Sequence, residues 1–218
     1  MEKEILPGLE IYLRSNRRAR NLRLSINKEG QAVLTIPFLC SKRRALKWAE
    51  SQWGWIQKNT FTPQKFTLGQ KFFLLGKEVS LEKSPNRISF LENDILYICG
   101  ESAFIHRRTK DFIKKELLPV LQKKVKEKAT LLNVPYKRIT IRDTSTRWGS
   151  CSSQGNLSFC WRIALAPTEV LDYLVAHEVS HLKHMDHSPQ FWKTVATLTP
   201  HIQMSKRWLK ANGQKLPK

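Results

Sequence analysis

The chain has only four cysteines among its 218 residues, and their positions suit neither a disulfide framework nor a zinc ribbon. Cys40, Cys99, Cys151 and Cys160 are scattered along the sequence and form no C-x-x-C pair. Both kinds of cross-linked domain need cysteines at characteristic close spacings. We therefore expect a protein of a reducing compartment.

Long apolar runs are also missing. Residues 1–20, MEKEILPGLEIYLRSNRRAR, lack the uninterrupted apolar stretch of a signal peptide. No later window approaches the ~18 apolar residues of a membrane span. The apolar content of 41% is ordinary for a globular fold, so disorder is not favoured. The expectation is a cytoplasmic, soluble protein with no membrane partner.

Acidic residues are scarce: 18 Asp and Glu stand against 38 Lys and Arg, a net charge of +20. Such an excess attracts polyanions, so nucleic acid and nucleotides are candidate partners. The densest basic cluster, RSNRRAR from Arg14 to Arg20, is a candidate for phosphate contacts. A solvated face that only confers solubility explains the same cluster equally well.

The N-terminal part of the sequence reads as mainly β. Alternating short runs over residues 9–36 predict antiparallel, hairpin-like strands, and the pattern from Ser41 to about residue 59 predicts one amphipathic helix capped by Ser41. A second group of short strands reaches Cys99. No repeat of fixed period is visible. We expect a β-rich region with one helix over residues 1–100.

The remaining residues, 101–218, form the second expected domain. Apolar residues at helical spacing predict a helix from about Ser102 to Asn133, and Pro119 is expected to kink or divide that helix. Strands are expected at 137–142 and 156–164. The second of these contains NLSFCWRIAL, our candidate for a sheet edge to which a peptide could add as a strand. Prolines mark the starts of three further helices, at Pro167, Ser188-Pro189 and Pro200.

The first of these later helices carries an H-E-x-x-H motif, His177-Glu178-Val179-Ser180-His181. Residues four apart lie one turn above each other on a helix, so the two imidazoles can converge on one metal ion. Many helices carry histidine and glutamate on their surface, so the motif alone is a moderate signal. The apolar LDYLVA before it and four histidines within eleven residues strengthen the metal interpretation.

A catalytic zinc site takes three protein ligands, so a third ligand is needed. His184 could share the helical face, whereas His187 requires the chain to leave the helix and turn back. The position of His187 just before Ser188-Pro189 favours it. The spacing of four and then six residues is also that of metzincin peptidases, with His184 at their glycine position. His184 is then a second-layer or surface residue.

The expected cofactor is Zn²⁺, although three imidazoles bind nickel or copper more tightly. Zinc would lower the pKa of its bound water to about 7, and Glu178 would act as the general base. The oxyanion that forms needs a positive or hydrogen-bonding partner. Arg147, Tyr173 and His201 are the candidates, and the sequence does not rank them.

The segment Thr146-Arg147-Trp148-Gly149-Ser150-Cys151 precedes a predicted strand. One interpretation is a structural corner, in which Trp148 packs on the motif helix, Gly149 supplies an unusual backbone angle and Cys151 is a small buried side chain. The other makes Arg147 a substrate anchor. Cys151 and Cys160 have no partner at ligand spacing, so neither is favoured as a metal ligand.

Several of these segments together resemble the YgjP-like metallopeptidase family, which is related to SprT-type zincins. The resemblance lies in RWGSCSSQGNLSFCWRIALAP and VLDYLVAHEVSHLKHMDHSPQFW, and it extends to NLRLSINKEGQAVLTIPFLCSKRRALKWAESQWGWIQK and FLLGKEVSLE. It implies an α+β fold with a zincin-like domain. The implied metal ligands are His177, His181 and His187, with Glu178 as base.

The resemblance fixes the chemistry better than the substrate. A zinc peptidase acting on peptide or protein is the first hypothesis. A metal-dependent nucleotide pyrophosphohydrolase is the second, because the basic surface would attract nucleotides. The third is a basic nucleic-acid-binding module without catalysis. SprT-type relatives act on protein bound to DNA, which suits the charge of this chain only by analogy.

Overall fold

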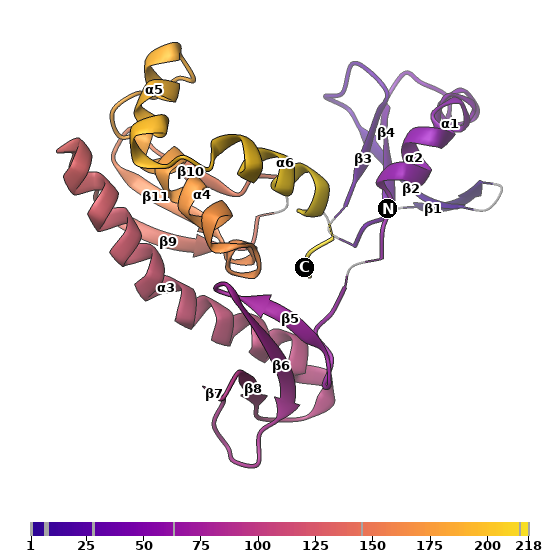
Figure 1. Cartoon of the computed structure of the whole chain (residues 1–218). Helices are drawn as coiled ribbons and strands as arrows, with labels where there is room; N and C mark the ends of the chain where they lie inside the picture. Colours follow the sequence, from indigo (N-terminus) through magenta and orange to yellow (C-terminus); the bar gives the residue numbers. More distant parts are fainter. Residues whose placement is uncertain are drawn as a thin grey trace. The chain divides into compact units, whose positions relative to one another are not determined.

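The computed structural model describes residues 2–6, 9–27, 29–62, 64–144, 146–213 and 215–217. The chain divides into two compact units, residues 1–64 and 65–218 (Figure 1). Each unit has a hydrophobic core of its own. Among the described helices, none combines the length and apolar character needed to cross a membrane.

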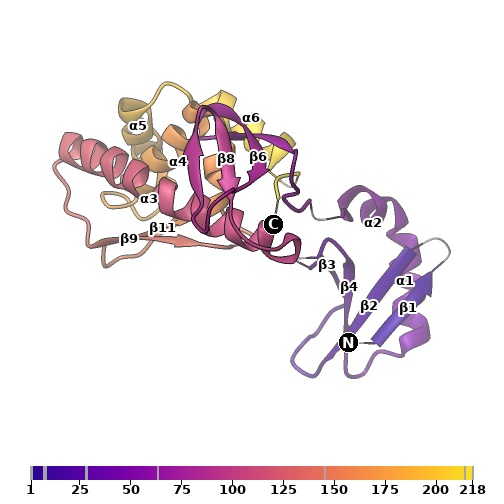
Figure 2. The same cartoon turned by 90° about the horizontal axis from the view of Figure 1, so that it is seen from below.

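The N-terminal unit contains a four-stranded sheet in the order β1-β2-β4-β3, whose strands are labelled in Figure 2. Its strands are β1 (Glu2–Leu6), β2 (Leu9–Asn16), β3 (Arg23–Ile26) and β4 (Ala32–Pro37). The pair of β3 and β4 is antiparallel as expected, and so is the pair of β1 and β2, for which no strand was expected at β1. In contrast, β2 and β4 run parallel. The expectation of simple hairpins was wrong for this pair, because the chain after β2 crosses to the sheet edge and returns as β4.

One face of this sheet is covered by two short helices, α1 (Lys42–Ser51) and α2 (Trp53–Asn59). The predicted single helix is therefore broken at Gln52. The predicted cap is confirmed, since the Ser41 side chain accepts a hydrogen bond from the Arg44 N–H at 3.3 Å.

The second unit begins with a sheet of the same topology, β5-β6-β8-β7, with a parallel central pair. Its strands are β5 (Lys71–Leu74), β6 (Lys77–Lys83), β7 (Phe90–Glu92) and β8 (Ile95–Ile98). The two sheets thus repeat an arrangement of strands without a visible sequence repeat.

These four strands share the core of the following helices, so the compact units divide after Gln64 rather than near residue 100. Leu81 and Leu96 are fully buried in the same cluster as Ile113 and Leu117 of α3 (Ile105–Leu132). Burial of these side chains against α3 stabilises the second unit rather than the first.

Pro119 does not divide α3, which runs continuously over 28 residues. A proline removes one backbone hydrogen bond. The buried stripe of Ile113, Leu117, Leu121 and Val125 continues on both sides of it, so packing holds the helix together.

A third sheet has the order β10-β11-β9, formed by β10 (Gly149–Cys151), β11 (Asn156–Cys160) and β9 (Arg138–Arg142). The expected edge strand was wrong: β11 is the middle strand, paired with β10 on one side and β9 on the other. Residues 161–165 form a buried 3-10 helix instead of prolonging the strand.

Three helices complete the unit: α4 (Thr168–Ser180), α5 (Pro189–Leu198) and α6 (Ile202–Asn212). Ser188 caps α5 ahead of Pro189 as predicted, by accepting from the Phe191 N–H at 3.4 Å. Pro167 stands at the cap of α4 instead of inside its first turn. Contacts of α4 with α3, α5, α6 and β10 place this helix at the centre of the unit.

Candidate metal centre

The structure brings His177, His181 and His187 together. One nitrogen of each lies within 4.8 Å of the others, and Nε2 of His177 is 3.2 Å from Nε2 of His187. His177 lies in the last turn of α4 and His181 caps that helix. The chain then leaves the helix and turns back before α5, and this turn carries His187 to the pair.

His184 holds His181 through its backbone. Nδ1 of His181 lies 3.0 Å from the carbonyl oxygen of His184. A carbonyl can only accept, so Nδ1 carries the proton and Nε2 is left with a free lone pair. Histidines that bind metals are oriented by a hydrogen bond of this kind at the second nitrogen.

An aromatic wall from the start of α5 supports the three imidazoles. The Phe191 ring stacks on His181 with centroids 4.4 Å apart and meets His177 edge-on at 5.0 Å. Trp192 lies 5.7 Å from His177 and 5.9 Å from His187. Phe191 is fully buried, so the wall is part of the core and fixes the rings from one side.

The electrostatics favour the neutral form of two of these imidazoles, His177 and His181. Burial, followed by the nearby charges of His181, His187 and Lys206, lowers the pKa of His177 to about 3. Burial also lowers the pKa of His181. Neutral imidazoles with lone pairs directed at one another are the form that binds a transition metal.

Glu178 lies beside this cluster with only 4% of its surface exposed. Burial raises its pKa to about 8, while the positive charge of Arg147 acts in the opposite direction. Three buried side-chain polar atoms lack a hydrogen-bond partner among the described residues, and two of them lie here, Oε2 of Glu178 and Nδ1 of His177; the third is Nε of Arg162. Buried polar atoms are normally paired, so the orphans of Glu178 and His177 mark a site shaped for a ligand. The three histidines and the orphaned carboxylate oxygen fit a bound metal ion.

Gly149 of β10 makes room for the Glu178 carboxylate. A Cβ added at Gly149 would lie 2.7 Å from Cδ and Cγ of Glu178 and closer still to Oε1. Gly149 is not among the glycines with positive φ. The sequence interpretation of an unusual backbone angle was therefore wrong, because close approach and not conformation requires the glycine.

Tyr173 and Cys151 also face Glu178. Burial, followed by the negative charge of Glu178, raises the pKa of Tyr173 to about 12 and that of Cys151 to about 11. Both groups stay protonated at neutral pH. Cys151 is then neither a thiolate ligand nor a nucleophile.

Of the other residues that the sequence singled out, Arg147 lies near Glu178, whereas Trp148 and His201 have no described contact with the three histidines. Arg147 is exposed, with its charge within range of Glu178. Trp148 packs against Gly213 beyond α6, and the Arg162 guanidinium lies 5.6 Å from its ring. His201 immediately precedes α6, and no described contact joins its side chain to the three histidines. A role for His201 at the site stays a prediction.

Sequence reasoning missed Lys206 of α6. Its Nζ lies 3.5 Å from the centroid of the Trp192 ring, and its charge reaches His177. No motif marks it, since it lies nineteen positions beyond the third histidine on an ordinary basic helix. The one sequence feature that could have pointed to Lys206 is that its helix, α6, comes soon after the H-E-x-x-H motif in the chain.

The fold and the three-histidine cluster define a zincin-like metallopeptidase domain. The chain belongs to the YgjP-like family: a family model described as YgjP-like, metallopeptidase domain, matches residues 20–212. Membership makes it a metal-dependent hydrolase.

One solved structure is similar in part, the crystal structure of the metallopeptidase zymogen of Pyrococcus abyssi abylysin. It shares 19% identity and a TM-score of 0.38, over 42% of this chain and 93% of that one. No curated protein matches the chain.

Proposed function

We propose that the chain is a zinc-dependent peptidase with His177, His181 and His187 as metal ligands and Glu178 as general base. The observation that carries the proposal is the convergence of three imidazole nitrogens within 4.8 Å beside a buried carboxylate. Three nitrogen ligands leave a position open, as catalytic zinc sites do. The metal, when bound, would supply a Lewis acid that makes water a better nucleophile.

The chain's own part in the chemistry is proton transfer by Glu178. With its pKa at about 8, this carboxylate has a proton affinity suited to exchange near neutral pH. It takes a proton from the attacking water and returns it to the leaving amine. The apolar wall and the burial of Glu178 limit competition from bulk water for that proton.

Charge that develops on the substrate carbonyl oxygen needs a donor. Tyr173 keeps its hydroxyl proton at neutral pH and lies near Glu178, so it can donate a hydrogen bond. Arg147 supplies positive charge from the exposed side of the same carboxylate. We assign the oxyanion contact to these two residues ahead of His201.

A peptide suits the site because β10 is an edge strand within the described sheet, paired with β11 alone. Gly149 of β10 lies against Glu178, so a peptide added along this strand would pass the base. Main-chain hydrogen bonds to an edge strand bind peptides of varied sequence. This placement favours a peptide bond over a nucleotide phosphoanhydride as the target.

The test compares the Glu178→Gln variant with wild-type protein on casein-like substrates and on a panel of nucleotides. We expect the variant to lose at least about a hundredfold in kcat/KM because a general base contributes that much or more. Zinc content should be unchanged in this variant and lost in a His177→Ala, His181→Ala double variant. Glu169→Gln, the same change at the start of α4, is the matched control and should keep full activity.

Equal hydrolysis by wild type and the Glu178→Gln variant would overturn the role of Glu178. Hydrolysis of nucleotides alone would overturn the peptidase assignment and favour a pyrophosphohydrolase. Elemental analysis identifies the metal, because nickel or copper could occupy the same ligands. Absence of every metal after zinc is supplied would overturn the site itself.

A further inference from the structure

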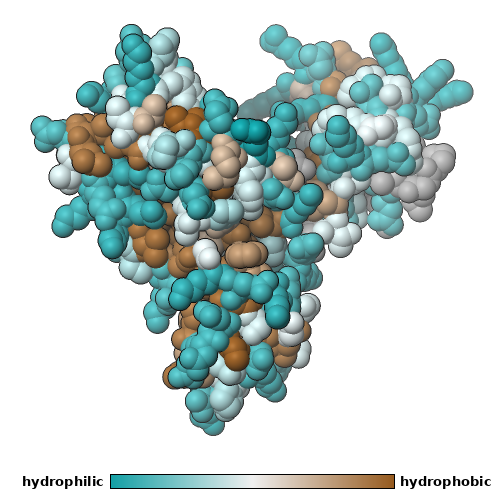
Figure 3. Space-filling view, viewed as in Figure 1, coloured by the Kyte–Doolittle hydropathy of each residue, from teal (hydrophilic) through white to brown (hydrophobic). Residues whose placement is uncertain are grey.

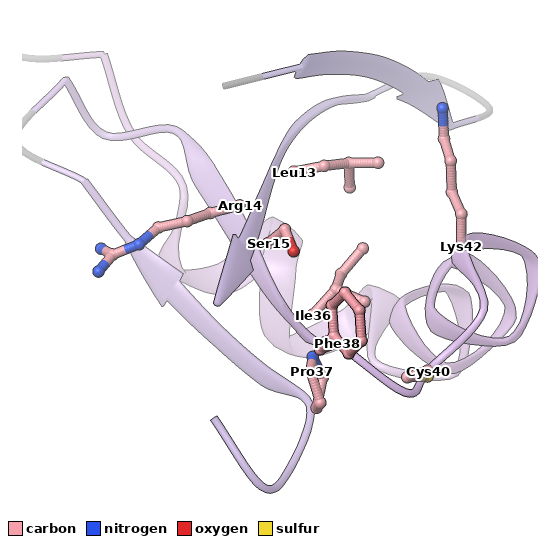
Figure 4. A pocket seen from close by; sticks show the side chains of 8 residues that line it. All are labelled: Leu13, Arg14, Ser15, Ile36, Pro37, Phe38, Cys40 and Lys42. Atoms are coloured by element: carbon pink, nitrogen blue, oxygen red, sulfur yellow. The ribbon is translucent and has the colours of Figure 1, made fainter. Parts of the chain in front are cut away.

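The sheet of the N-terminal unit has one covered face and one open face. Residues that alternate along β2 and β4 point into the core beneath α1 and α2: Ile11, Leu13, Ala32, Leu34 and Ile36. Their neighbours point the other way because successive side chains of a strand alternate. Figure 4 shows this for one pair, with Leu13 and Arg14 extending in opposite directions.

Arginines gather on the open face. A concave surface there is lined by four of them, Arg14, Arg18, Arg20 and Arg23, which we call the basic face. All four are exposed, and none forms an ion pair with the residues that the structure describes. The sequence has no acidic residue between Glu10 and Glu29, so the charge is not balanced locally.

The rest of the lining is suited to a sugar-phosphate chain. Asn16, Asn21, Ser25 and Thr35 offer amide and hydroxyl groups beside the arginines. Guanidinium groups bind phosphate through two parallel hydrogen bonds, and short polar side chains add contacts to phosphate and sugar. The apolar lining is limited to parts of Ala19 and Leu22, too little for insertion into a membrane.

An exposed aromatic ring stands in the turn after β4, at the end of the sheet where Arg17 and Arg18 follow β2. Phe38 follows β4 directly and has 66% of its surface exposed. Because β2 and β4 are parallel and Asn16 pairs with Pro37, the turns after both strands lie at the same end of the sheet. The guanidinium of Arg17 accordingly lies 5.5 Å from the Phe38 ring.

Phe38 also lines a second hollow, which shares Arg14 with the basic face (Figure 4). The exposed Phe38 ring, in contact with Arg17 and in a hollow that Arg14 also lines, offers stacking for an unpaired base, and the arginines offer charge for the phosphates that follow it. Base pairs of a duplex keep their faces stacked on one another and cannot use such a ring without opening.

We propose that the basic face and Phe38 together bind single-stranded nucleic acid. The second unit is not a matching occupant, because its 26 Lys and Arg against 13 Asp and Glu make it positive as well. In Figure 3 the visible surface of the N-terminal unit is mixed, with hydrophilic side chains beside residues of intermediate hydropathy and a few hydrophobic ones. The proposal does not depend on the hydrolase activity.

The test measures fluorescence anisotropy of a labelled oligothymidine of about 20 nucleotides with the full chain over a series of salt concentrations. Each phosphate contact to a single strand contributes about −0.7 to the slope of log affinity against log salt, so four arginines predict a slope of about −3. Two sets of four Gln substitutions are compared. The test set replaces Arg14, Arg18, Arg20 and Arg23, and the control set replaces exposed lysines of the second unit, Lys115, Lys123, Lys126 and Lys210.

We expect the basic-face set to weaken binding at least about tenfold and to flatten the salt slope, and the control set to do neither. A separate Phe38→Ala variant should lose at least about fivefold for the single strand and little for a duplex. Circular dichroism and thermal melts of all these variants check that the N-terminal unit, which has its own hydrophobic core, is still folded. Hydrolase activity should be unchanged, because the candidate metal centre lies in the other unit.

Three results would overturn the proposal. Equal losses in both charge sets would show that net charge alone attracts the oligonucleotide. A duplex bound as tightly as the single strand, with no effect of Phe38→Ala, would remove the stacking role. Competition by polyglutamate as strong as that by unlabelled oligonucleotide would make the face a site for acidic peptides.

Discussion

Gly149 matters because the side chain of Glu178 lies directly against it. Its Cα packs on the Glu178 side chain, so the carboxylate takes its position from the backbone of β10 as well as from α4. A glycine in a short edge strand would otherwise be a weak point, since it packs no side chain. Here the missing Cβ leaves the space that the carboxylate of Glu178, the proposed general base, occupies.

We predict that Gly149→Ala abolishes most hydrolysis while sparing the fold. The new methyl group must displace the Glu178 carboxylate, and a shift of about 1 Å in a catalytic group can cost a hundredfold in rate. The metal ligands are untouched, so metal content should equal that of wild type. The measurement is kcat/KM together with elemental analysis and a thermal melt.

Gly54→Ala is the matched control, because a Cβ at Gly54 meets nothing within 4 Å. It lies in α2, where alanine is the better helix former by up to about 1 kcal/mol. Activity should be unchanged and stability equal or slightly higher. Full activity of Gly149→Ala would show that Glu178 does not need its present position.

At the scale of elements, α4 is tied to α3 by a network of charges. Asp172 of α4 accepts hydrogen bonds from Lys124 and Lys128 of α3, each at 3.0 Å, and Lys128 also donates to the carbonyl of Leu198 at 2.7 Å. Lys128 is buried, with 7% of its surface exposed. The network fixes the helix that carries the H-E-x-x-H motif.

This network makes stability depend on pH. Burial disfavours the charged form of Asp172, but the hydrogen bonds and charges of Lys128 and Lys124 outweigh it and leave its pKa below the usual value. A carboxyl group with a lowered folded-state pKa contributes stability above its unfolded pKa of about 4 and loses it as pH falls through the folded value. We predict a free energy of unfolding that falls below about pH 4, and less steeply in Asp172→Asn.

At neutral pH, Asp172→Asn should itself cost about 2 kcal/mol, because a hydrogen-bonded buried ammonium loses its charged partner. Asp111→Asn removes a carboxylate from an exposed pair with Lys114 on the same helix α3 and should cost little. Urea titrations at several pH values measure all three proteins. Identical acid profiles for wild type and Asp172→Asn would contradict the linkage.

At the scale of the whole molecule, the two units have separate hydrophobic clusters. Every residue assigned to the candidate metal centre lies in the unit of residues 65–218. A unit of this length buries enough surface to fold alone.

We therefore predict that a fragment of residues 65–218 folds, binds metal and hydrolyses short peptides within about threefold of the full chain, because the metal-binding core is intact. Its affinity for oligonucleotide should fall, since the basic face is removed. Circular dichroism, metal content and peptide turnover measure the outcome. An insoluble fragment, or one without metal, would show that the N-terminal unit completes the fold.

Some features were decided by local sequence and could be predicted from it. The four-residue spacing of His177 and His181 places both on one face wherever a helix forms, and Ser41 and Ser188 cap helices through contacts within three residues. The position of His187 between two helix signals indicated the turn that brings it back. The α+β class followed from a change of apolar period along the chain.

Other features depended on pairing between distant segments, which local patterns do not encode. The sequence showed strands at β2, β4 and β11 but could not show that β2 and β4 run parallel or that β11 lies in the middle of its sheet. Register and partner are set by side-chain packing across strands far apart in sequence.

The same limit applies to the candidate site. His177, Glu178 and His181 could be predicted from the sequence because a helix holds them at fixed spacing. The contact of Gly149 with Glu178 could not, because it joins residues 29 positions apart. Lys206 and the boundary after Gln64 likewise came from packing. The residue types and the helical spacing of a metal site are local, so the amino-acid pattern was enough to predict the chemistry. The surroundings of that chemistry arise from packing, because burial and close approach depend on the whole core.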